Sequence, residues 1–270
     1  MQKISGTKIA QKIIEKLKQQ SLPSKAFVAI LVGSDPVSRS FLKKKERIAD
    51  ELGVQFELYE FPETFSSDAL RRSVSDIARQ KRVGGVMIQL PMPHHIQKHY
   101  VLNAIPREKD VEVLGERSLG AFYNNRNSIT PPAVSVVKSI LQYNNYDLTD
   151  KKVAIVGLGS LVGKPLAVWC MGQAQTMFLL DKGSDYSALK EADIIITGTG
   201  DAGIITSSML KKDAFVIDFG YSIKEKDGKK ILQGDFVPAR TDDGVFYTPT
   251  PNGTGPILVA SLFENFFILN

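Results

Sequence analysis

The 270-residue chain contains one cysteine, one tryptophan and three histidines. A single cysteine, Cys170, excludes an internal disulfide and is typical of a protein from the reducing cytoplasm. No apolar run approaches the roughly 18–20 residues that a membrane-spanning helix requires. The first residues, MQKISGTKIAQKIIEKL, predict an amphipathic helix and lack the apolar core of a signal peptide. We therefore expect a cytoplasmic protein that does not enter a membrane.

The chain also lacks a strong excess of charge of either sign: it has 34 Lys and Arg and 29 Asp and Glu, for a net charge of +5. This excess either steers anionic small molecules toward the protein or is a solvated surface. The basic residues are not interleaved with aromatic residues, which argues against a nucleic-acid partner. His95 and His99 have a spacing that suits a metal, but no cysteine or carboxylate accompanies them, so we expect no metal site.

Apolar strand patterns and amphipathic helix patterns alternate along the chain. The expected strands are 26–32, 54–61, 85–90, 153–156, 176–181, 193–197 and 214–219. The expected helices are 4–20, 38–52, 66–80, 131–143, 161–170 and 253–267. This order predicts an α/β fold with mostly parallel sheets. The polar stretch 124–130 is a candidate crossing between two such domains, which we expect to flank a cleft.

The most informative stretch is KVAIVGLGSLVGKP, which begins at Lys152. A buried strand, a glycine turn and a helix N-terminus in this order are typical of a dinucleotide-binding βαβ unit, in which the turn approaches the pyrophosphate. The third glycine is Gly163, one position later than in the usual G-x-G-x-x-G spacing. The pattern alone leaves two interpretations open, a Rossmann-type cofactor site or an ordinary strand–helix turn.

Asp181 closes the strand that follows the glycine turn. An acid about 20 residues beyond such a turn commonly accepts hydrogen bonds from the adenosine ribose hydroxyls. A carboxylate in this place favours NAD, since it repels the 2′-phosphate of NADP. The alternative is an aspartate that merely ends a strand in a turn.

Two further patterns are candidates for acid–base chemistry. Ser38, Phe41 and Lys45 lie at i, i+3 and i+7, so a helix places them on one face, whereas Lys43 and Lys44 leave on other faces. A lysine beside an aromatic ring can be a desolvated acid–base group, although a solvated basic face gives the same spacing.

The stretch GGVMIQLPMP places Gln89 at the carboxyl end of an apolar strand, where α/β sheets collect ligand-binding groups. Its amide there can hold a lysine or a substrate carbonyl. The alternative is a strand-end glutamine that satisfies only its own hydrogen bonds.

These patterns occur together in one known family. The runs VGSDPVSRSFLKKKERIADELGV, VGGVMIQLPMPHHI, IPREKDVEVLGERSLG, VGLGSLVGKP, ADIIITGTG, VIDFG, QGDF and TPTPNGTGP have the order and spacing seen in methylenetetrahydrofolate dehydrogenase/cyclohydrolases. The resemblance covers nearly the whole chain. It implies a folate-binding catalytic domain over 1–120 and a Rossmann-type NAD(P)-binding domain over 121–252, which includes the linking helix near 131–143. The helix 253–270 is expected to pack back on the first domain.

The resemblance also implies an activity and a set of residues for it. Members oxidise 5,10-methylenetetrahydrofolate with a nicotinamide cofactor and hydrolyse the methenyl product to 10-formyltetrahydrofolate. Lys45 corresponds to the acid–base residue, Gln89 to its partner, and Glu112 to the carboxylate that holds the pterin. The implied folate-binding residues are Ser38, Phe41, Ile88, Leu90, Pro251, Asn252, Gly253, Thr254 and Gly255. The implied cofactor-binding residues are Gly157, Leu158, Gly159, Asp181 and Tyr221.

Some of these positions depart from the family pattern. Phe41 stands where a tyrosine is usual, and Glu112-Val113 replaces an aspartate–glycine pair. The usual glycine–arginine–serine turn is Gly157-Leu158-Gly159. The resemblance implies NADP as cofactor, whereas Asp181 favours NAD, and it implies a homodimer built on the Rossmann-type domain. Two alternative functions stay open: a folate- or dinucleotide-binding paralogue without turnover, and an enzyme with dehydrogenase activity alone.

Overall fold

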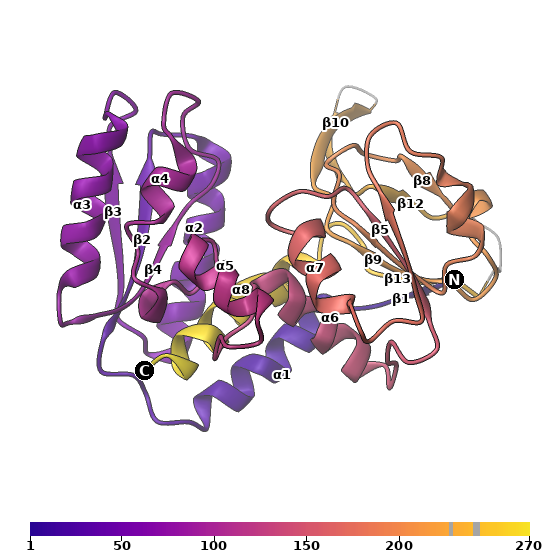
Figure 1. Cartoon of the computed structure of the whole chain (residues 1–270), viewed down its shortest axis with the longest axis horizontal. Helices are drawn as coiled ribbons and strands as arrows, with labels where there is room; N and C mark the ends of the chain where they lie inside the picture. The colour runs from indigo at the N-terminus through magenta and orange to yellow at the C-terminus, as the bar shows by residue number, and fades with distance from the viewer. Residues whose placement is uncertain (227–228, 240–243) are drawn as a thin grey trace. The chain divides into compact units, whose positions relative to one another are not determined.

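The computed structural model describes residues 1–226, 229–239 and 244–270 (Figure 1). Its contacts divide the chain into two units. Unit 1 comprises residues 1–11 and 133–258, and unit 2 comprises residues 12–132 and 259–270. Each unit is an α/β domain with a parallel sheet, as the alternation of strands and helices predicted. The functional boundaries placed at residues 120 and 252 stay a prediction.

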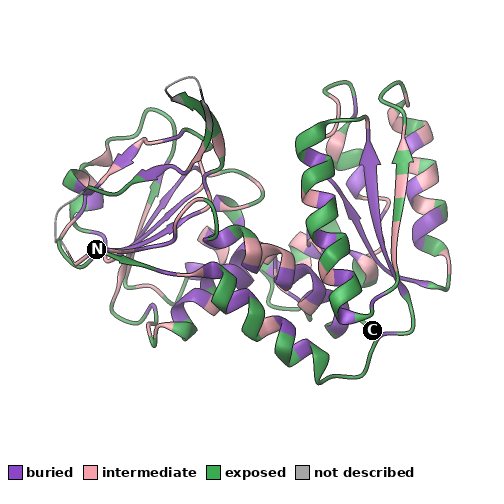
Figure 2. Ribbon diagram, turned by 180° about the vertical axis from the view of Figure 1, so that it is seen from behind, coloured by how far each residue is buried: buried purple, intermediate pink, exposed green. Residues whose placement is uncertain are grey.

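Unit 2 is built on a three-stranded parallel sheet of order β3-β2-β4. Its strands are β2 (Ala26–Val32), β3 (Phe56–Phe61) and β4 (Val83–Ile88). Every residue of β2 and β4 is buried, whereas β3 at the edge alternates partly buried and exposed positions (Figure 2). This difference explains why β2 and β4 are continuous apolar runs, as is usual for parallel strands covered on both faces.

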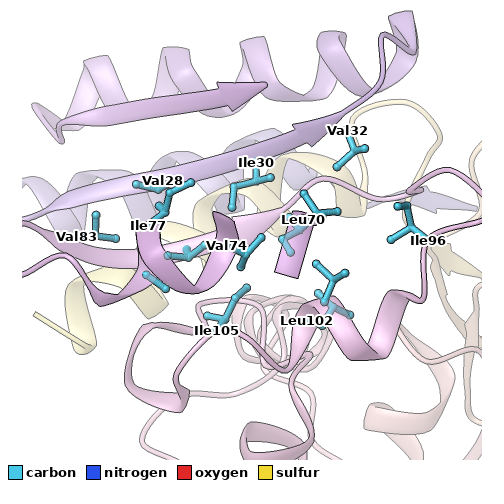
Figure 3. Close-up of a cluster of buried hydrophobic side chains, with 14 residues drawn as sticks. Val28, Ile30, Val32, Leu70, Val74, Ile77, Val83, Ile96, Leu102 and Ile105 are labelled. Carbon is cyan, nitrogen blue, oxygen red and sulfur yellow. The ribbon is translucent and has the colours of Figure 1, made fainter. Parts of the chain in front are cut away.

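The helices of unit 2 cover both faces of this sheet. They are the second part of α1 (Gly6–Lys18), α2 (Pro36–Leu52), α3 (Ser67–Arg79), α4 (Lys98–Leu102), α5 (Glu116–Tyr123) and the end of α8 (Thr254–Ile268), with a 3₁₀ turn η1 (Arg107–Lys109). On one face, side chains of α3 interlock with those of β2, among them Val28, Ile30 and Val74 (Figure 3). On the other face, Phe27 of β2 contacts Phe263 and Phe266 of α8, with ring centroids 5.1 and 5.2 Å apart.

Unit 1 contains a six-stranded sheet of order β1-β13-β9-β7-β5-β6, and every neighbouring pair is parallel. Its strands are β1 (Gln2–Lys3), β5 (Lys152–Val156), β6 (Thr176–Leu180), β7 (Ile194–Thr197), β9 (Phe215–Asp218) and β13 (Phe246–Tyr247). From β5 the chain proceeds to β6 on one side and then to β7 on the other. Such a reversal opens a crevice at the carboxyl ends of the strands, the usual ligand site of open α/β sheets.

The remaining elements of unit 1 surround that sheet. They are α6 (Pro132–Tyr143), α7 (Gly163–Cys170), the 3₁₀ turns η2 (Tyr186–Lys190) and η3 (Ser207–Met209), the short parallel pair β8 (Ile205–Thr206) and β12 (Phe236–Val237), and the antiparallel pair β10 (Ser222–Lys226) and β11 (Lys229–Gln233). Within the described ranges, no helix is both long and apolar enough to cross a bilayer.

Candidate active site

Helix α2 turns one lysine toward the protein interior. The helix starts where Asp35 Oδ2 accepts a hydrogen bond from the Ser38 backbone N–H at 2.8 Å, and it ends at Gly53 in the left-handed conformation. Its buried positions recur every three or four residues: Ser38, Leu42, Lys45, Ala49 and Leu52. This register buries Lys45 and leaves the adjacent Lys43 and Lys44 exposed to solvent, as the helical spacing predicted.

Lys45 and Gln89 form a buried pair. They retain 8% and 7% of their exposed surface, and Lys45 Nζ donates a hydrogen bond of 2.7 Å to Gln89 Oε1. Gln89 Nε2 in turn donates to the Leu90 backbone oxygen at 2.7 Å. A carbonyl oxygen can only accept, so the Leu90 carbonyl turns the amide oxygen of Gln89 toward the lysine. Strand β4 ends one residue earlier, at Ile88, and thereby positions this amide.

The loop from Asp110 to Gly115 brings a carboxylate to the same strand end. Asp110 forms an isolated parallel bridge with Val86 of β4. Its Oδ2 atom accepts hydrogen bonds from the backbone N–H groups of Leu114 at 3.0 Å and Gly115 at 2.8 Å. The Ile88 backbone N–H lowers the pKa of the Glu112 carboxyl, which shows that this carboxyl lies at the end of β4. Asp110 therefore shapes the loop, and the loop places Glu112 beside Lys45.

The proton affinities of these groups are shifted toward each other. Burial lowers the pKa of Lys45, and the nearby Glu112 carboxylate opposes that shift. Burial raises the pKa of Glu112 to about 7 although its side chain keeps some exposed surface; the attraction of Lys45 lowers it and the repulsion of Asp110 raises it. An acid and an amine with pKa values moved toward neutrality are suited to proton transfer.

The other predicted residues of this region lie on α2 or at the end of β4. Ser38 is buried, and Phe41 is partly buried with the Lys44 ammonium 5.2 Å from its ring centroid. Ile88 is buried and Leu90 is partly exposed. Ser38 and Phe41 therefore share a helix with Lys45, and Ile88 and Leu90 flank its partner Gln89; their roles in folate binding stay a prediction.

The glycine turn of unit 1 fits a bound dinucleotide. Gly157 has φ +88°, which L residues rarely adopt. A Cβ atom on Gly163 would lie 2.0 Å from the Gly157 carbonyl oxygen, whereas Gly159 has no neighbour within 4 Å. Helix α7 begins at Gly163, so the late third glycine lets the helix start against the strand end. The backbone around the exposed Gly159 is open to an approaching pyrophosphate, as a glycine turn at a strand end allows.

Asp181 lies at the same edge of the sheet as the glycine turn. Val156 of β5 pairs with Leu180 of β6, and Gly157 and Asp181 are the residues that follow them. Asp181 is exposed, and its Oδ1 accepts a hydrogen bond from the Lys182 backbone N–H at 2.9 Å. Leu158 is partly exposed and Tyr221 is 41% exposed. The glycine turn from Gly157 to Gly159 therefore contains no cation, and the exposed Lys182 is the cation that directly follows Asp181.

The turn from Pro251 to Gly255 belongs to unit 1. Pro251, Asn252 and Gly255 are exposed, whereas Gly253 and Thr254 are buried. The Asn252 backbone oxygen accepts a hydrogen bond from the Gly6 N–H at 2.9 Å. The predicted role of this turn in folate binding stays a prediction.

Sequence reasoning gave no role to three buried acids that organise these sites. Asp110 shapes the Glu112 loop, and Asp218 and Asp235 lie at strand ends of unit 1. Their signal was present, because they belong to the KDV, VIDFG and QGDF runs, but no spacing showed that Asp218 and Asp235 meet. Among the residues with a described position, no cluster of three or more metal-binding side chains occurs.

Fold and site together define a class. The chain is a two-domain α/β protein in which one unit carries a dinucleotide-type glycine turn and the other a buried, lysine-centred acid–base group. Family models extend this description: residues 4–112 match the catalytic domain of tetrahydrofolate dehydrogenase/cyclohydrolase, and residues 129–269 match its NAD(P)-binding domain. The chain belongs to the tetrahydrofolate dehydrogenase/cyclohydrolase family, which confirms the resemblance seen in the sequence.

Individual relatives agree over nearly the whole length. The bifunctional protein FolD of Bacillus anthracis is 31% identical, with 97% of this chain and 94% of the relative covered. The structure of the bifunctional FolD dehydrogenase/cyclohydrolase from Campylobacter jejuni has a TM-score of 0.88 at 27% identity, covering 97% of this chain and 96% of that one. The Trypanosoma brucei FolD structure, solved with NADP and an inhibitor, matches in fold, with a TM-score of 0.90 at 24% identity and coverage of 99% and 96%.

Proposed function

We propose that the chain oxidises 5,10-methylenetetrahydrofolate to 5,10-methenyltetrahydrofolate with NAD(P) and hydrolyses that product to 10-formyltetrahydrofolate in one-carbon metabolism. The observation that carries this proposal is the buried Lys45, which donates to Gln89 and faces the Glu112 charge. The bifunctional relatives from B. anthracis and C. jejuni support both activities.

Lys45 has the properties that the hydrolytic step requires. Water adds to the cationic methenyl carbon and must lose a proton, and the ring nitrogen that leaves must gain one. Burial lowers the pKa of Lys45, so its amine is available to take the proton from water and return it to the nitrogen. Gln89 Oε1 orients the lysine by accepting a hydrogen bond from its Nζ. Glu112 is assigned to the amino and N3 hydrogens of the pterin.

In the oxidation, the methylene carbon loses a hydride and becomes the methenyl cation. A bound nicotinamide dinucleotide supplies the hydride acceptor. We assign its binding to the backbone of the turn Gly157-Leu158-Gly159, with Gly163 at the start of α7, and to Tyr221 near the end of β9. Orientation contributes much of the rate of such a step, because both reactants are held in one geometry.

We assign cofactor preference to Asp181 and infer that NAD is preferred over NADP. The Asp181 carboxylate is exposed at the end of β6, and the adjacent turn offers Leu158 and Gly159 in place of a cation. An exposed carboxylate accepts hydrogen bonds from ribose hydroxyls and repels a phosphate dianion. Asp181→Ser should move the ratio of kcat/KM values toward NADP. A wild type that prefers NADP, or a ratio that does not move, would contradict this assignment.

Absorbance measurements on the purified protein test the two activities separately. Oxidation of methylenetetrahydrofolate is followed by formation of the reduced nicotinamide, and hydrolysis is followed by loss of methenyl absorbance. We expect both rates. Hydride transfer without hydrolysis would show a dehydrogenase alone, and neither rate despite folate binding would show a binding protein.

We further infer that the protein is a homodimer built on unit 1. Strand β6 is at the edge of the six-stranded sheet, and Leu179 on it is 49% exposed. Nearby in sequence, Leu161 and Met171 are 48% and 53% exposed at the two ends of the α7 region. An apolar edge strand is a template for pairing with another strand, and a second copy of the same edge satisfies it across a two-fold axis.

A further inference from the structure

Two carboxyl groups meet in the interior of unit 1. Asp218 ends β9, Asp235 precedes β12, and they are 2% and 0% exposed. Both oxygens of Asp218 accept backbone hydrogen bonds: Oδ1 from Gly220 at 2.7 Å and from Asp235 at 3.2 Å, and Oδ2 from Phe236 at 3.0 Å. A protonated carboxyl oxygen would direct its O–H at these N–H groups, which can only donate. Asp218 is therefore the ionised member of the pair.

Asp235 is satisfied on one oxygen only. Its Oδ2 accepts hydrogen bonds from the Thr197 hydroxyl at 2.8 Å and from the Thr199 backbone N–H at 2.7 Å. Its Oδ1 is buried and has no hydrogen-bond partner among the described residues. A proton on Asp235 Oδ1 would remove the cost of burying an unpartnered charge, and it would also remove the repulsion between the two carboxylates.

Two glycines make room for the pair. A Cβ atom on Gly220 would lie 2.2 Å from Asp235 Oδ1, and a Cβ atom on Gly234 would lie 2.1 Å from Asp218 Oδ2. Each glycine follows or precedes one acid closely in sequence and packs against the other acid. Because Gly220 also donates to Asp218, the main chain at Gly220 contacts both acids.

The titratable groups around the pair are few. Burial and the neighbouring Asp235 raise the pKa of Asp218 to about 7, so the pair keeps one proton at neutral pH. The N–H groups on both Asp218 oxygens leave Asp235 Oδ1 as the place for that proton. Burial raises the pKa of Tyr186 on η2, and the charges of Asp181, Asp201 and Asp235 raise it further, so the phenol stays neutral. The Lys224 ammonium donates a hydrogen bond of 2.6 Å to the Ala202 backbone oxygen. Within residues 1–226, 229–239 and 244–270, no lysine or arginine forms an ion pair with either acid, so a proton is the remaining source of compensation.

We propose that Asp218 and Asp235 share one proton, carried on Asp235 Oδ1, and that this pair is the positioning device that joins the strand ends around the dinucleotide site. Asp235 fixes Thr197 and Thr199 at the end of β7, and Asp218 fixes Gly220 beside Tyr221. The Thr254 hydroxyl donates to the Asp218 backbone oxygen at 2.9 Å, which connects the 251–255 turn. The positioning role rests on the proposed function, whereas the shared proton does not.

Thermal unfolding without cofactor tests the shared proton. In Asp235→Asn the amide oxygen can keep the two Thr197 and Thr199 hydrogen bonds, while the amide N–H takes the place of the proton. In Asp218→Asn any orientation of the amide turns its N–H₂ toward a backbone N–H. We therefore expect Asp235→Asn to fold with a Tm near that of the wild type, and Asp218→Asn to lower the Tm at every pH. Asp185→Asn is the control for loss of one charge, because Asp185 is the exposed N-cap of η2 and asparagine can keep its hydrogen bond from the Ser187 N–H.

The sign of the pH dependence follows from the raised pKa. The folded pair keeps a proton that an unfolded aspartate, with its ordinary pKa of 3.8, has released. The contribution of the pair to stability is therefore greatest below that ordinary value and is lost as the pH rises toward about 7. We expect the decline in Tm between pH 5 and pH 8 to be smaller in Asp235→Asn than in the wild type and in Asp185→Asn. An unchanged decline, or an Asp235→Asn variant as unstable as Asp218→Asn, overturns the shared proton.

Calorimetric titration with NAD and NADP tests the positioning role. Asp235→Asn should retain the wild-type Kd at pH 6 and, unlike the wild type, should not lose affinity as the pH rises to 8. Asp235→Ala releases Thr197 and Thr199, so we expect Kd and KM for the dinucleotide to rise by about tenfold with KM for folate unchanged. Equal effects on both KM values, or no effect, overturn the positioning role. A wild type that binds neither dinucleotide refutes the proposed function, and the unfolding experiment still decides the shared proton.

Discussion

At the scale of single residues, Lys45 differs from Lys43 and Lys44 because its ammonium is taken out of water. Burying a charge beside a carboxylate rarely adds stability, so such a group is better explained by chemistry. We expect Lys45→Met to lower the rate of methenyl hydrolysis by at least about 10²-fold, the usual contribution of general acid–base catalysis. Stopped-flow absorbance of the methenyl substrate measures this rate.

Lys43→Met and Lys44→Met are the matched controls, since they remove the same group from the neighbouring exposed positions. Both should keep their hydrolysis rate, and all three variants should keep the wild-type circular dichroism spectrum. Equal losses of hydrolysis rate in the three variants would contradict the acid–base role of Lys45.

Val113 is a second residue whose position is informative, because it is a fully buried β-branched residue at φ +56°. A left-handed conformation costs an L residue about 1–2 kcal/mol, and glycine escapes that cost. We expect Val113→Gly to be more stable than Val113→Ala by about 1 kcal/mol in urea denaturation, the reverse of the usual order. Val111, buried in the same loop without a positive φ, is the control at which alanine should be the more stable of the two.

Local spacing predicted part of this site and could not predict the rest. The helical period showed that Lys45 leaves α2 on a different face from Lys43 and Lys44, and the end of an apolar strand marked Gln89. The hydrogen bond between Lys45 and Gln89 depends on how α2 packs against β4, which no local pattern contains. Local patterns also could not predict that Asp218 and Asp235 lie near each other, because this depends on the pairing of β12 with β8.

At the scale of elements, the turn from β5 to α7 depends on two glycines for different reasons. A Cβ atom on Gly163 would overlap the Gly157 carbonyl, so Gly163→Ala must shift the main chain, at a cost of about 1–3 kcal/mol or more. Gly159→Ala meets no atom within 4 Å and should keep the wild-type stability. Because Gly159 is exposed at the turn, we expect this variant to weaken dinucleotide binding alone.

Differential scanning calorimetry and dinucleotide titration of the two glycine variants separate these effects. A Gly163→Ala variant with unchanged Tm would show that the turn can relax without cost. A Gly159→Ala variant with unchanged affinity would show that the dinucleotide backbone does not approach this position.

Long elements were predicted well and short ones were not. The strand 26–32 has the predicted bounds, and the helix expected over 38–52 starts two residues earlier because Asp35 caps it and Pro36 opens it. The two-residue strands β1, β8, β12 and β13 are too short to show a period of two, and only their partners define them. Helix α5 and the hairpin strands β10 and β11 were also missed, since polar residues interrupt their patterns.

At the scale of the whole molecule, the inferred dimer makes a prediction about one edge strand. Leu179→Lys places a charge on the exposed edge of β6 and should give a monomer mass by light scattering at micromolar concentration, where the wild type gives a dimer mass. Leu58→Lys is the matched control, because Leu58 is 42% exposed on β3, the edge strand of the other sheet. A wild-type monomer at all concentrations would refute the dimer.

Neither unit is a continuous piece of chain, since the chain passes between them after Gln11, after Pro132 and after Leu258. The Phe27 side of the unit 2 sheet is completed by Phe263 and Phe266, which belong to the segment beyond Leu258. During synthesis, domains ordinarily fold in turn as they leave the ribosome. Here the first sheet to emerge must wait, with Phe27 lacking its α8 partners, until residues 133–258 have also been translated. Its folding is thereby tied to translation of the other unit, and in that interval the nascent chain exposes a surface of the kind that chaperones bind.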